Sequence, residues 1–548
     1  MSRWSTSFLA GLILLCLGGL APPSDASTTV HTGLSPLRLA HATVADDTSE
    51  AAHLAQWFRT HRHRPPLLRD FLQAMPKGAD LHTHLIGAVY AESYLAWARE
   101  QGLCAQLNPG KIVQCTAPGR GSASSVVPMD SVMSTSSLYR KMIDALSVRN
   151  LEKYRTTGRE QFFATFNRFG AVYRDQPLRK GDALAELVRR AASQNVQHVE
   201  VIINDSHGRA DSIASTVSYT KDWSTLRSRL LDAGLRSAVQ QGRTFLTQAE
   251  QRADSLLNCG TSPTPTACTV TRRYRMYAVR VGSPLQVFAR LLYAVERARA
   301  DSRVEAVDLV APEDHRIALR DYDLHMRMLR FLQTAGAPPQ QDSVAVGLHA
   351  GELTLGSVPP QHLHDHVWTA IRVAGAQRIG HGVDVGYEHD TRALFRRMRT
   401  QDICVEVCLT SNDVILDVTG ASHPLPDYLA ADVPVTLATD DEGVLRTDLT
   451  HEFVRASRTY DLTYSTVKTL SRNSLHYSFL DGRSLWRSDA YDRYAPPCAE
   501  AQPGEETEQI SASCRTFLQS NPKAAAEWRL ERAFHDFETS YRPPLSDP

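Results

Sequence analysis

The sequence predicts an α/β fold, a TIM-type (β/α)8 barrel with an N-terminal helical segment, an insertion after the first strand and a C-terminal extension. Two observations predict this fold, the series of β-rich runs and the helical stretches between them. Eight short runs rich in β-branched residues follow one another along the chain, and longer stretches with helical periodicity separate them. This alternation is typical of parallel strands joined by helices, and eight such units close into a barrel. The length of 548 residues indicates one large domain with additions, or two to three domains.

Composition and charge exclude several classes of protein. Hydrophobic residues make up 42% of the chain and charged residues 22%, which excludes a largely disordered protein. Lys+Arg and Asp+Glu both number 60, so no overall basic field favours nucleic acid as a partner. No apolar run reaches the ~18–20 residues that span a bilayer, and we expect no membrane association of the mature chain.

The N-terminus resembles a secretory signal peptide over residues 1–26. Arg3 supplies the positive start, residues 8–17 form a short apolar core, and Ser24 and Ala26 are small residues before a cleavage site. We therefore expect an exported protein, periplasmic or secreted. A buried N-terminal helix is the alternative interpretation.

The predicted barrel occupies residues 76–480 and follows an N-terminal helical segment over 27–75. An inserted loop or subdomain rich in Ser, Gly and Pro is predicted at 101–137, and the pattern fades into a polar tail over 481–548. The predicted strands are Ala79–Leu85, Val196–Ile203, Tyr274–Val281, Val304–Val310, Val344–His349, Ala376–His381, Ile403–Leu409 and Val433–Thr439. The helices expected between the first two strands are Arg140–Thr156, Arg159–Tyr173 and Asp182–Gln194.

Eight cysteines remain once the signal peptide, with Cys16, is removed. Six of them form pairs that each flank a short polar loop, as expected for disulfides made in an oxidising compartment. These pairs are Cys104 with Cys115, Cys259 with Cys268, and Cys498 with Cys514. Cys404 and Cys408 lie four apart in a predicted strand, where they would be about 13 Å apart, so we expect buried free thiols.

Histidine and aspartate residues lie at the C-terminal ends of four predicted strands, where barrel enzymes place their chemistry. They are His82 and His84, then His349, then His381, then Asp440 and Asp441. Residues two apart in a strand share a face, so His82 and His84 can bind one cation together. Three imidazoles and one carboxylate would leave a position on zinc for water.

Other polar residues are expected to have structural roles. The His61-Arg62-His63 run and the three histidines at 362, 364 and 366, in a predicted helix, are interpreted as solvated surface. Glu406 and Asn412 are expected to hydrogen-bond loops, and His423 to be architectural.

Four motifs in order resemble the adenosine deaminase family. They are Met75-Pro76-Lys77-Gly78-Ala79-Asp80-Leu81-His82-Thr83-His84, His349-Ala350-Gly351-Glu352, Arg378-Ile379-Gly380-His381-Gly382 and Thr439-Asp440-Asp441. The lead-in Met-Pro-Lys-Gly, the signal peptide and the insertion look most like the secreted, growth-factor-related branch. The resemblance covers about Leu67 to Leu480.

The resemblance implies a purine nucleoside as small-molecule substrate and one zinc ion per chain, held by His82, His84, His349 and Asp440. His381 would orient the attacking water and take its proton, and Glu352 would protonate the purine ring. Asp441 would hydrogen-bond the imidazole side of the purine, and the backbone N–H of Ala311 would face it. The expected reaction converts adenosine or 2′-deoxyadenosine to the inosine product and ammonia.

Four departures from the family pattern are present. A proline usual after the aspartate pair and another usual near Leu409 are missing, and the other two concern the substrate. Ile86 stands where the intracellular members usually carry an aspartate associated with the ribose 5′-hydroxyl, and Ala311 stands where glycine is common. Ribose recognition is therefore expected to differ or to come from the insertion, and the exact substrate stays open. A second enzyme hypothesis is deamination of another aminopurine, such as adenine or a modified adenosine. The His/Cys/Cys zinc deaminases are set aside, because their PCxxC signature does not occur here.

Two non-enzymatic hypotheses stay open beside these. The protein could be an extracellular nucleoside- or receptor-binding protein with weak activity, or a barrel that uses its metal for stability. Structural zinc sites favour thiolates and lack a spare acid, which Glu352 and His381 argue against. The sequence also allows a homodimer and does not decide the oligomeric state.

Overall fold

The computed structural model describes residues 49–115, 126–153, 156–174, 178–206, 208–336 and 344–544. The predicted signal peptide lies outside the described residues. Within the described ranges, no helix combines the length and the apolar character needed to cross a membrane.

Eight parallel strands form one sheet in the order β1-β5-β6-β7-β8-β9-β10-β11, which confirms the predicted barrel and all eight predicted strands. They are β1 (Gly78–His84), β5 (Val196–Ile203), β6 (Thr271–Val279), β7 (Val304–Val310), β8 (Ala345–Ala350), β9 (Arg378–His381), β10 (Cys404–Val407) and β11 (Val435–Leu437). The first strand meets the end of the last through two hydrogen bonds. Asp440 N donates to His82 O at 2.8 Å, and His84 N donates to Asp440 O at 3.2 Å. The barrel is therefore joined at residues predicted to bind metal.

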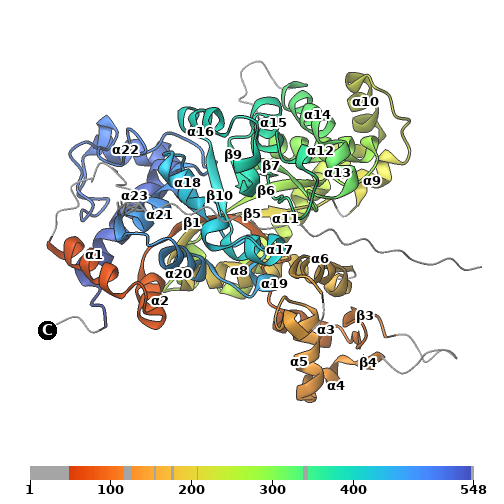
Figure 1. The fold of residues 1–548 in the computed structure, drawn as a ribbon, viewed down its shortest axis with the longest axis horizontal. Helices are drawn as coiled ribbons and strands as arrows, with labels where there is room; N and C mark the ends of the chain where they lie inside the picture. The colour runs from red at the N-terminus through yellow and green to blue at the C-terminus, as the bar shows by residue number, and fades with distance from the viewer. Residues whose placement is uncertain are drawn as a thin grey trace, which may run out of the picture. The chain divides into compact units, whose positions relative to one another are not determined.

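Helices surround the strands (Figure 1). Those between β5 and β11 are α9 (Arg209–Ala214), α10 (Trp223–Leu230), α11 (Arg236–Leu257), α12 (Pro284–Ala300), α13 (Arg316–Arg320), α14 (Tyr322–Thr334), α15 (His366–Thr369), α16 (Thr391–Thr400), α17 (Leu409–Leu416) and α18 (Leu425–Ala430). After β11 come α19 (Glu442–Leu445), α20 (Leu449–Thr459) and α21 (Tyr464–His476). Helix α12 shows how the sequence sets a boundary, because Ser283 and Gln286 form a capping box and Pro284 occupies the first turn.

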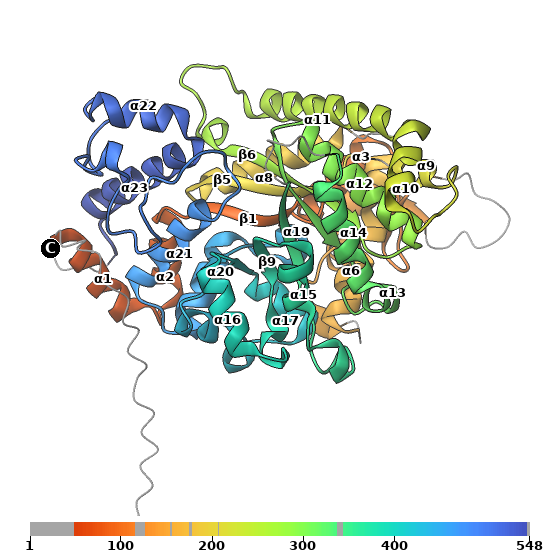
Figure 2. The ribbon, with the colours of Figure 1, turned by 90° about the horizontal axis from the view of Figure 1, so that it is seen from above.

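The segment between β1 and β5 contains the predicted insertion. Its elements are α3 (Ala91–Glu100), β2 (Cys104–Gln106), β3 (Lys111–Val113), β4 (Val126–Pro128), α4 (Met129–Ser134), α5 (Ser136–Ala145), α6 (Gly158–Phe169), α7 (Ala171–Arg174) and α8 (Arg179–Ser193). The three short strands form an antiparallel sheet in the order β3-β2-β4, and the disulfide between Cys104 and Cys115 ties it. Helix α8 packs on both β5 and α11 (Figure 2).

One predicted helix in this segment is wrong in extent. The pattern predicts a helix over Arg140–Thr156, whereas α5 ends at Ala145. The side chains of Arg149 and Asn150 donate to the Asp144 carboxylate, and Asn150 has a φ of 59°. These local bonds favour a turn over a further helical turn, because a side-chain acceptor replaces the helical partners.

The ends of the chain pack as helices. Helices α1 (Ser49–His61) and α2 (Pro65–Ala74) form the predicted N-terminal helical segment, and α22 (Ala512–Ser520) and α23 (Pro522–Ser540) lie in the C-terminal extension. The prediction of a polar tail is wrong, because the extension has a small apolar core. Its largest members are Trp486, Tyr491, Phe517 and Trp528.

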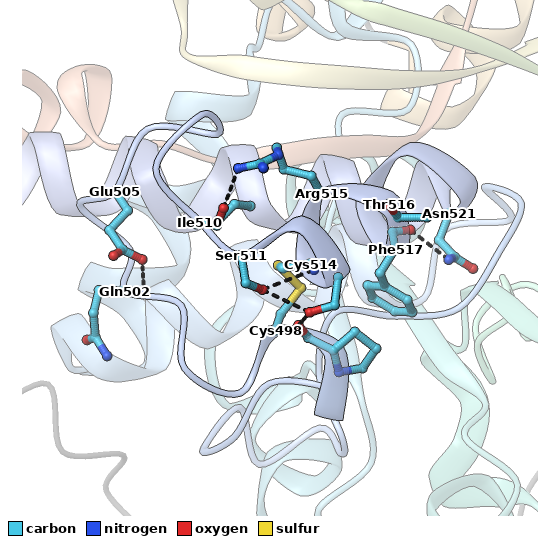
Figure 3. The surroundings of a disulfide bond; sticks show 12 residues. Cys498, Gln502, Glu505, Ile510, Ser511, Cys514, Arg515, Thr516, Phe517 and Asn521 are labelled. Carbon is cyan, nitrogen blue, oxygen red and sulfur yellow. Dashed lines mark hydrogen bonds between the residues drawn. A yellow bond between two sulfur atoms is a disulfide. The ribbon is translucent and has the colours of Figure 1, made fainter.

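A disulfide between Cys498 and Cys514 supports this small core (Figure 3). The Ser511 hydroxyl caps α22 by accepting a hydrogen bond from Cys514 N at 3.3 Å. The aromatic residues follow no regular period, so periodicity alone does not reveal the core. The disulfide between Cys259 and Cys268 is also present, and Cys404 and Cys408 are buried free thiols as predicted.

Candidate metal and catalytic site

Four side chains predicted to bind metal meet at the C-terminal end of the barrel. We call them the metal-site group: His82 and His84 of β1, His349 of β8, and Asp440 after β11. One ligand atom from each lies within 4.8 Å of all the others. The Nε2 atom of His349 is 3.0 Å from that of His82 and 3.1 Å from that of His84. The carboxylate Oδ1 of Asp440 is 3.4 Å from His84 Nε2.

Two buried carboxylates fix which imidazole nitrogens face inward. Glu406 Oε2 is 2.7 Å from His82 Nδ1, and Asp308 Oδ2 is 3.0 Å from His349 Nδ1. A carboxylate accepts a hydrogen bond, so the proton of each neutral ring lies on Nδ1 and each Nε2 is a bare lone pair. Two lone pairs 3.0 Å apart repel unless a cation lies between them. The donor set therefore fits a divalent cation.

Burial keeps His82 and His84 in the neutral form that binds metal, whereas the Asp308 carboxylate outweighs burial and raises the pKa of His349. Burial lowers the pKa of His82 to about 4 and that of His84 to about 3, so both are neutral. Burial alone would raise the pKa of Asp440, but the imidazoles around it, His84 first, hold that pKa below its usual range. Neutral imidazoles and an ionised carboxylate are the forms that coordinate a cation.

A buried arginine links the two carboxylates behind the metal-site group. Arg275 of β6 donates to Glu406 Oε1 at 2.6 Å and to Asp308 Oδ2 at 3.3 Å. It also donates to Glu200 Oε1 at 2.9 Å and to Leu81 O at 2.7 Å. The expectation that Glu406 bonds loops is wrong, because these partners lie on barrel strands. Arg275 is one of three arginines in β6, so the sequence of the strand does not single it out.

Glu352 and His381 stand beside the metal-site group. Glu352 Oε1 is 3.8 Å from His381 Nε2, and both have atoms within 4.8 Å of Asp440. Burial raises the pKa of Glu352, with Asp440 adding to the effect. A carboxyl whose pKa is raised can keep a proton to donate near neutral pH.

The loop that carries Glu352 is anchored from behind by Glu313. Its carboxylate accepts from Gly351 N at 3.2 Å and from Glu352 N at 2.8 Å. His366 Nδ1 is 2.7 Å from the same carboxylate, and only 3% of His366 is exposed. The prediction that His366 is solvated surface is therefore wrong. The predicted helix around it is also wrong, because Pro360–His362 and α15 are two separate short helical turns, and this places His366 against Glu313.

Asp441 is buried against the loop that follows β1. Burial and the charge of Asp440 raise the pKa of Asp441 well above its usual value. A Cβ added at Gly87 would lie 1.4 Å from Asp441 Oδ1, so only glycine lets this carboxyl occupy its position. Gly87 has no predicted role in the sequence. A glycine close behind the His82 and His84 pair is the signal that could have identified it.

Three predicted site residues have left-handed backbone conformations. The φ angles are 70° at His381, 58° at Asp440 and 94° at Ala311. Such conformations are costly for residues with a Cβ and concentrate at functional sites. Ile86 is half-buried and presents an apolar side chain, and its carbonyl accepts from the Tyr94 hydroxyl.

Replacing Ala311 with glycine is expected to stabilise the protein by about 1 kcal/mol, because glycine removes the steric cost of a left-handed residue. Urea unfolding of Ala311→Gly and the parent protein measures the change. The matched control is Ala306→Gly in β7, the strand that ends just before Ala311, at a buried position with no positive φ, where a loss of about 0.5–1 kcal/mol is expected. If Ala311→Gly lowered the free energy of unfolding as much as Ala306→Gly does, the backbone at Ala311 would not be strained.

The chain is similar in sequence to known adenosine deaminases. The family model described as adenosine deaminase matches residues 156–485. Curated adenosine deaminases from Escherichia coli O1:K1 and O157:H7 are 35% identical over 136 and 137 residues, 25% of this chain. The match spans 38% of the length of those relatives.

Solved structures of low sequence identity are similar to the chain. An adenine deaminase from Arthrobacter aurescens is 18% identical with a TM-score of 0.47, covering 74% of this chain and 94% of its own. The N6-methyl-AMP deaminase from Arabidopsis thaliana is 19% identical with a TM-score of 0.47, covering 75% and 94%. The family model covers more than half of the sequence, and on that match the chain belongs to the adenosine deaminase family.

Proposed function

We propose that the protein is a zinc-dependent deaminase that converts adenosine or 2′-deoxyadenosine to inosine or 2′-deoxyinosine and ammonia. One observation carries the proposal, which is the convergence of the metal-site group, Glu352 and His381 at one end of the barrel. Three imidazoles and a carboxylate suit a single zinc ion and leave room for water. Glu352, an acid beside the site that is not needed as a ligand, favours a catalytic metal over a structural one.

The residues of the site divide the work of hydrolysis. A zinc ion in the metal-site group would supply Lewis acidity, which lowers the pKa of water toward neutrality. Glu352 gives its proton to the ring nitrogen beside the carbon that carries the amino group, which makes that carbon electrophilic. Asp441 hydrogen-bonds the imidazole side of the purine, and the Ala311 N–H faces the ring. Water adds to the carbon, and of its two protons one restores the carboxyl and the other reaches the amino group, which leaves as ammonia when the C–N bond breaks.

Deamination of another aminopurine, such as adenine or a modified adenosine, is the second candidate. Ile86 favours it, because its side chain cannot accept a hydrogen bond from a ribose 5′-hydroxyl. The Ala311 methyl group also alters the space beside the purine.

Export to the periplasm or the medium is part of the proposal. The three disulfides support it, because such bonds persist in oxidising compartments. The disulfide-bearing insertion and the signal-like N-terminus favour the secreted, growth-factor-related branch of the family.

Removal of metal is expected to abolish ammonia release from adenosine, and added zinc is expected to restore it. The mature chain, made in an oxidising host, is assayed with adenosine, 2′-deoxyadenosine, adenine and N6-methyl-AMP before and after chelation. Zinc content is measured in parallel, with one ion per chain expected. Turnover of adenine or N6-methyl-AMP alone would favour the second candidate. Folded, zinc-loaded protein that releases no ammonia from the first three compounds and no methylamine from N6-methyl-AMP would contradict the proposal.

A further inference from the structure

A chain of three hydrogen bonds leads from the backbone to His381. Leu425 N donates to His423 Nδ1 at 3.1 Å. His423 Nε2 is 3.0 Å from Asn412 Oδ1, and Asn412 Nδ2 is 2.9 Å from His381 Nδ1. His423 is 2% exposed and Asn412 and His381 are 0% exposed, so water does not replace any of these partners.

The direction of the first bond fixes the directions of the others. A backbone N–H can only donate, so His423 Nδ1 accepts and the proton of the neutral ring lies on Nε2. Burial lowers the pKa of His423 to about 3, which keeps this ring neutral. His423 Nε2–H then donates to the Asn412 amide oxygen, which settles the orientation of that amide.

The Asn412 amide nitrogen therefore faces His381. An amide nitrogen only donates, so His381 Nδ1 is an acceptor and cannot carry a proton. The ring proton of His381 must then lie on Nε2. Within the described ranges that atom has no hydrogen-bond partner, and Glu352 Oε1 lies 3.8 Å from it.

We infer that Asn412 is a positioning residue that holds His381 as the Nε2–H tautomer, so that His381 donates a hydrogen bond to the attacking water. This role differs from that of proton acceptor, which the family resemblance implies. It deepens the proposed function and rests on it.

Glu352 then accounts for both proton transfers at the addition step. Its O–H bond breaks as the ring nitrogen takes the proton. The carboxylate that results takes the proton of the attacking water, whose electron pair forms the new bond to the ring carbon. His381 holds the water oxygen throughout and neither gains nor loses a proton.

Replacing Asn412 with aspartate tests this inference. A carboxylate still accepts from His423 Nε2–H, but it also accepts at His381 Nδ1 and so moves the His381 proton from Nε2 to Nδ1. We expect kcat to fall about 100-fold or more, with little change in KM or zinc content. The matched control is Asn521→Asp, a buried asparagine of the C-terminal extension whose side chain bonds Phe517 O (Figure 3), and we expect it to keep kcat.

The tautomer is read directly from nitrogen NMR of the zinc-loaded, 15N-histidine-labelled full chain. The His381 signals are assigned by their loss in His381→Gln. The inference expects an Nε2–H pattern in the parent protein and an Nδ1–H pattern in Asn412→Asp. An Nδ1–H pattern in the parent, or parental kcat in a folded Asn412→Asp, would overturn it. The NMR measurement on the parent protein needs no substrate and no Asn412 variant. It therefore tests the His381 tautomer even if the protein proves not to be a deaminase.

Discussion

Replacing Glu352 with glutamine is expected to lower kcat by about 10²–10⁴-fold while zinc content stays unchanged. Glutamine keeps the shape of the side chain and the backbone N–H that bonds Glu313, but it has no acidic proton to give. Glu352 lies on the loop after β8 and is not one of the four members of the metal-site group, so we expect the ligand atoms to stay in place. Ammonia release and metal analysis on the same preparations measure both quantities.

The control for this variant is Glu305→Gln. Glu305 is also a buried carboxyl whose pKa burial raises, to about 8, but it lies near the start of β7, at the end of the barrel away from the site. We expect Glu305→Gln to keep the parental kcat. A Glu352→Gln protein that kept its zinc and more than a tenth of the parental kcat would exclude Glu352 as the proton donor.

Replacing Arg275 with methionine is expected to destabilise the protein by about 3–5 kcal/mol, because Asp308 loses its buried cation and Glu406 keeps only Arg378. These two carboxylates orient His82 and His349, so zinc affinity is expected to fall about 10–100-fold. Urea unfolding gives the first quantity, and competition with a chelator in the absence of denaturant gives the second.

Arg327→Met provides the comparison for Arg275→Met. Arg327 forms an ion pair with Asp323 in which the two side chains are 58% and 62% exposed, and such pairs contribute less than about 1 kcal/mol. We expect this variant to match the parent in stability and in zinc affinity. An Arg275→Met protein as stable as Arg327→Met, with parental zinc affinity, would show that the arginine does not support the site.

The residues that could be predicted from the sequence are those whose signal is local. A strand is recognised from the period and the length of its hydrophobic pattern. Because the C-terminal ends of the eight strands lie at one end of the barrel, the sequence alone is enough to place His82, His349 and Asp440 together. The residues that could not be predicted act through contacts between distant strands. Arg275 and Glu313 sit in ordinary positions of the sequence, and only the closed barrel brings them behind the site.

The wrong predictions also concern residues whose contacts do not show in the hydrophobic pattern of the sequence. His366 resembles its exposed neighbours in sequence, but it is buried because Glu313 from another strand end reaches it. The C-terminal extension has no hydrophobic period, and its core forms from irregularly spaced aromatic residues held by a disulfide. Helix α5 ends early because Asp144 offers a local side-chain acceptor, which a periodicity argument does not weigh.

The most direct test of the proposed metal site is anomalous diffraction at the zinc edge from crystals of the zinc-loaded protein. We expect one strong peak about 2.0–2.2 Å from Nε2 of each of the three histidines and from a carboxylate oxygen of Asp440. A strong peak bound by other residues, or none at these four side chains in protein shown to contain zinc, would contradict it.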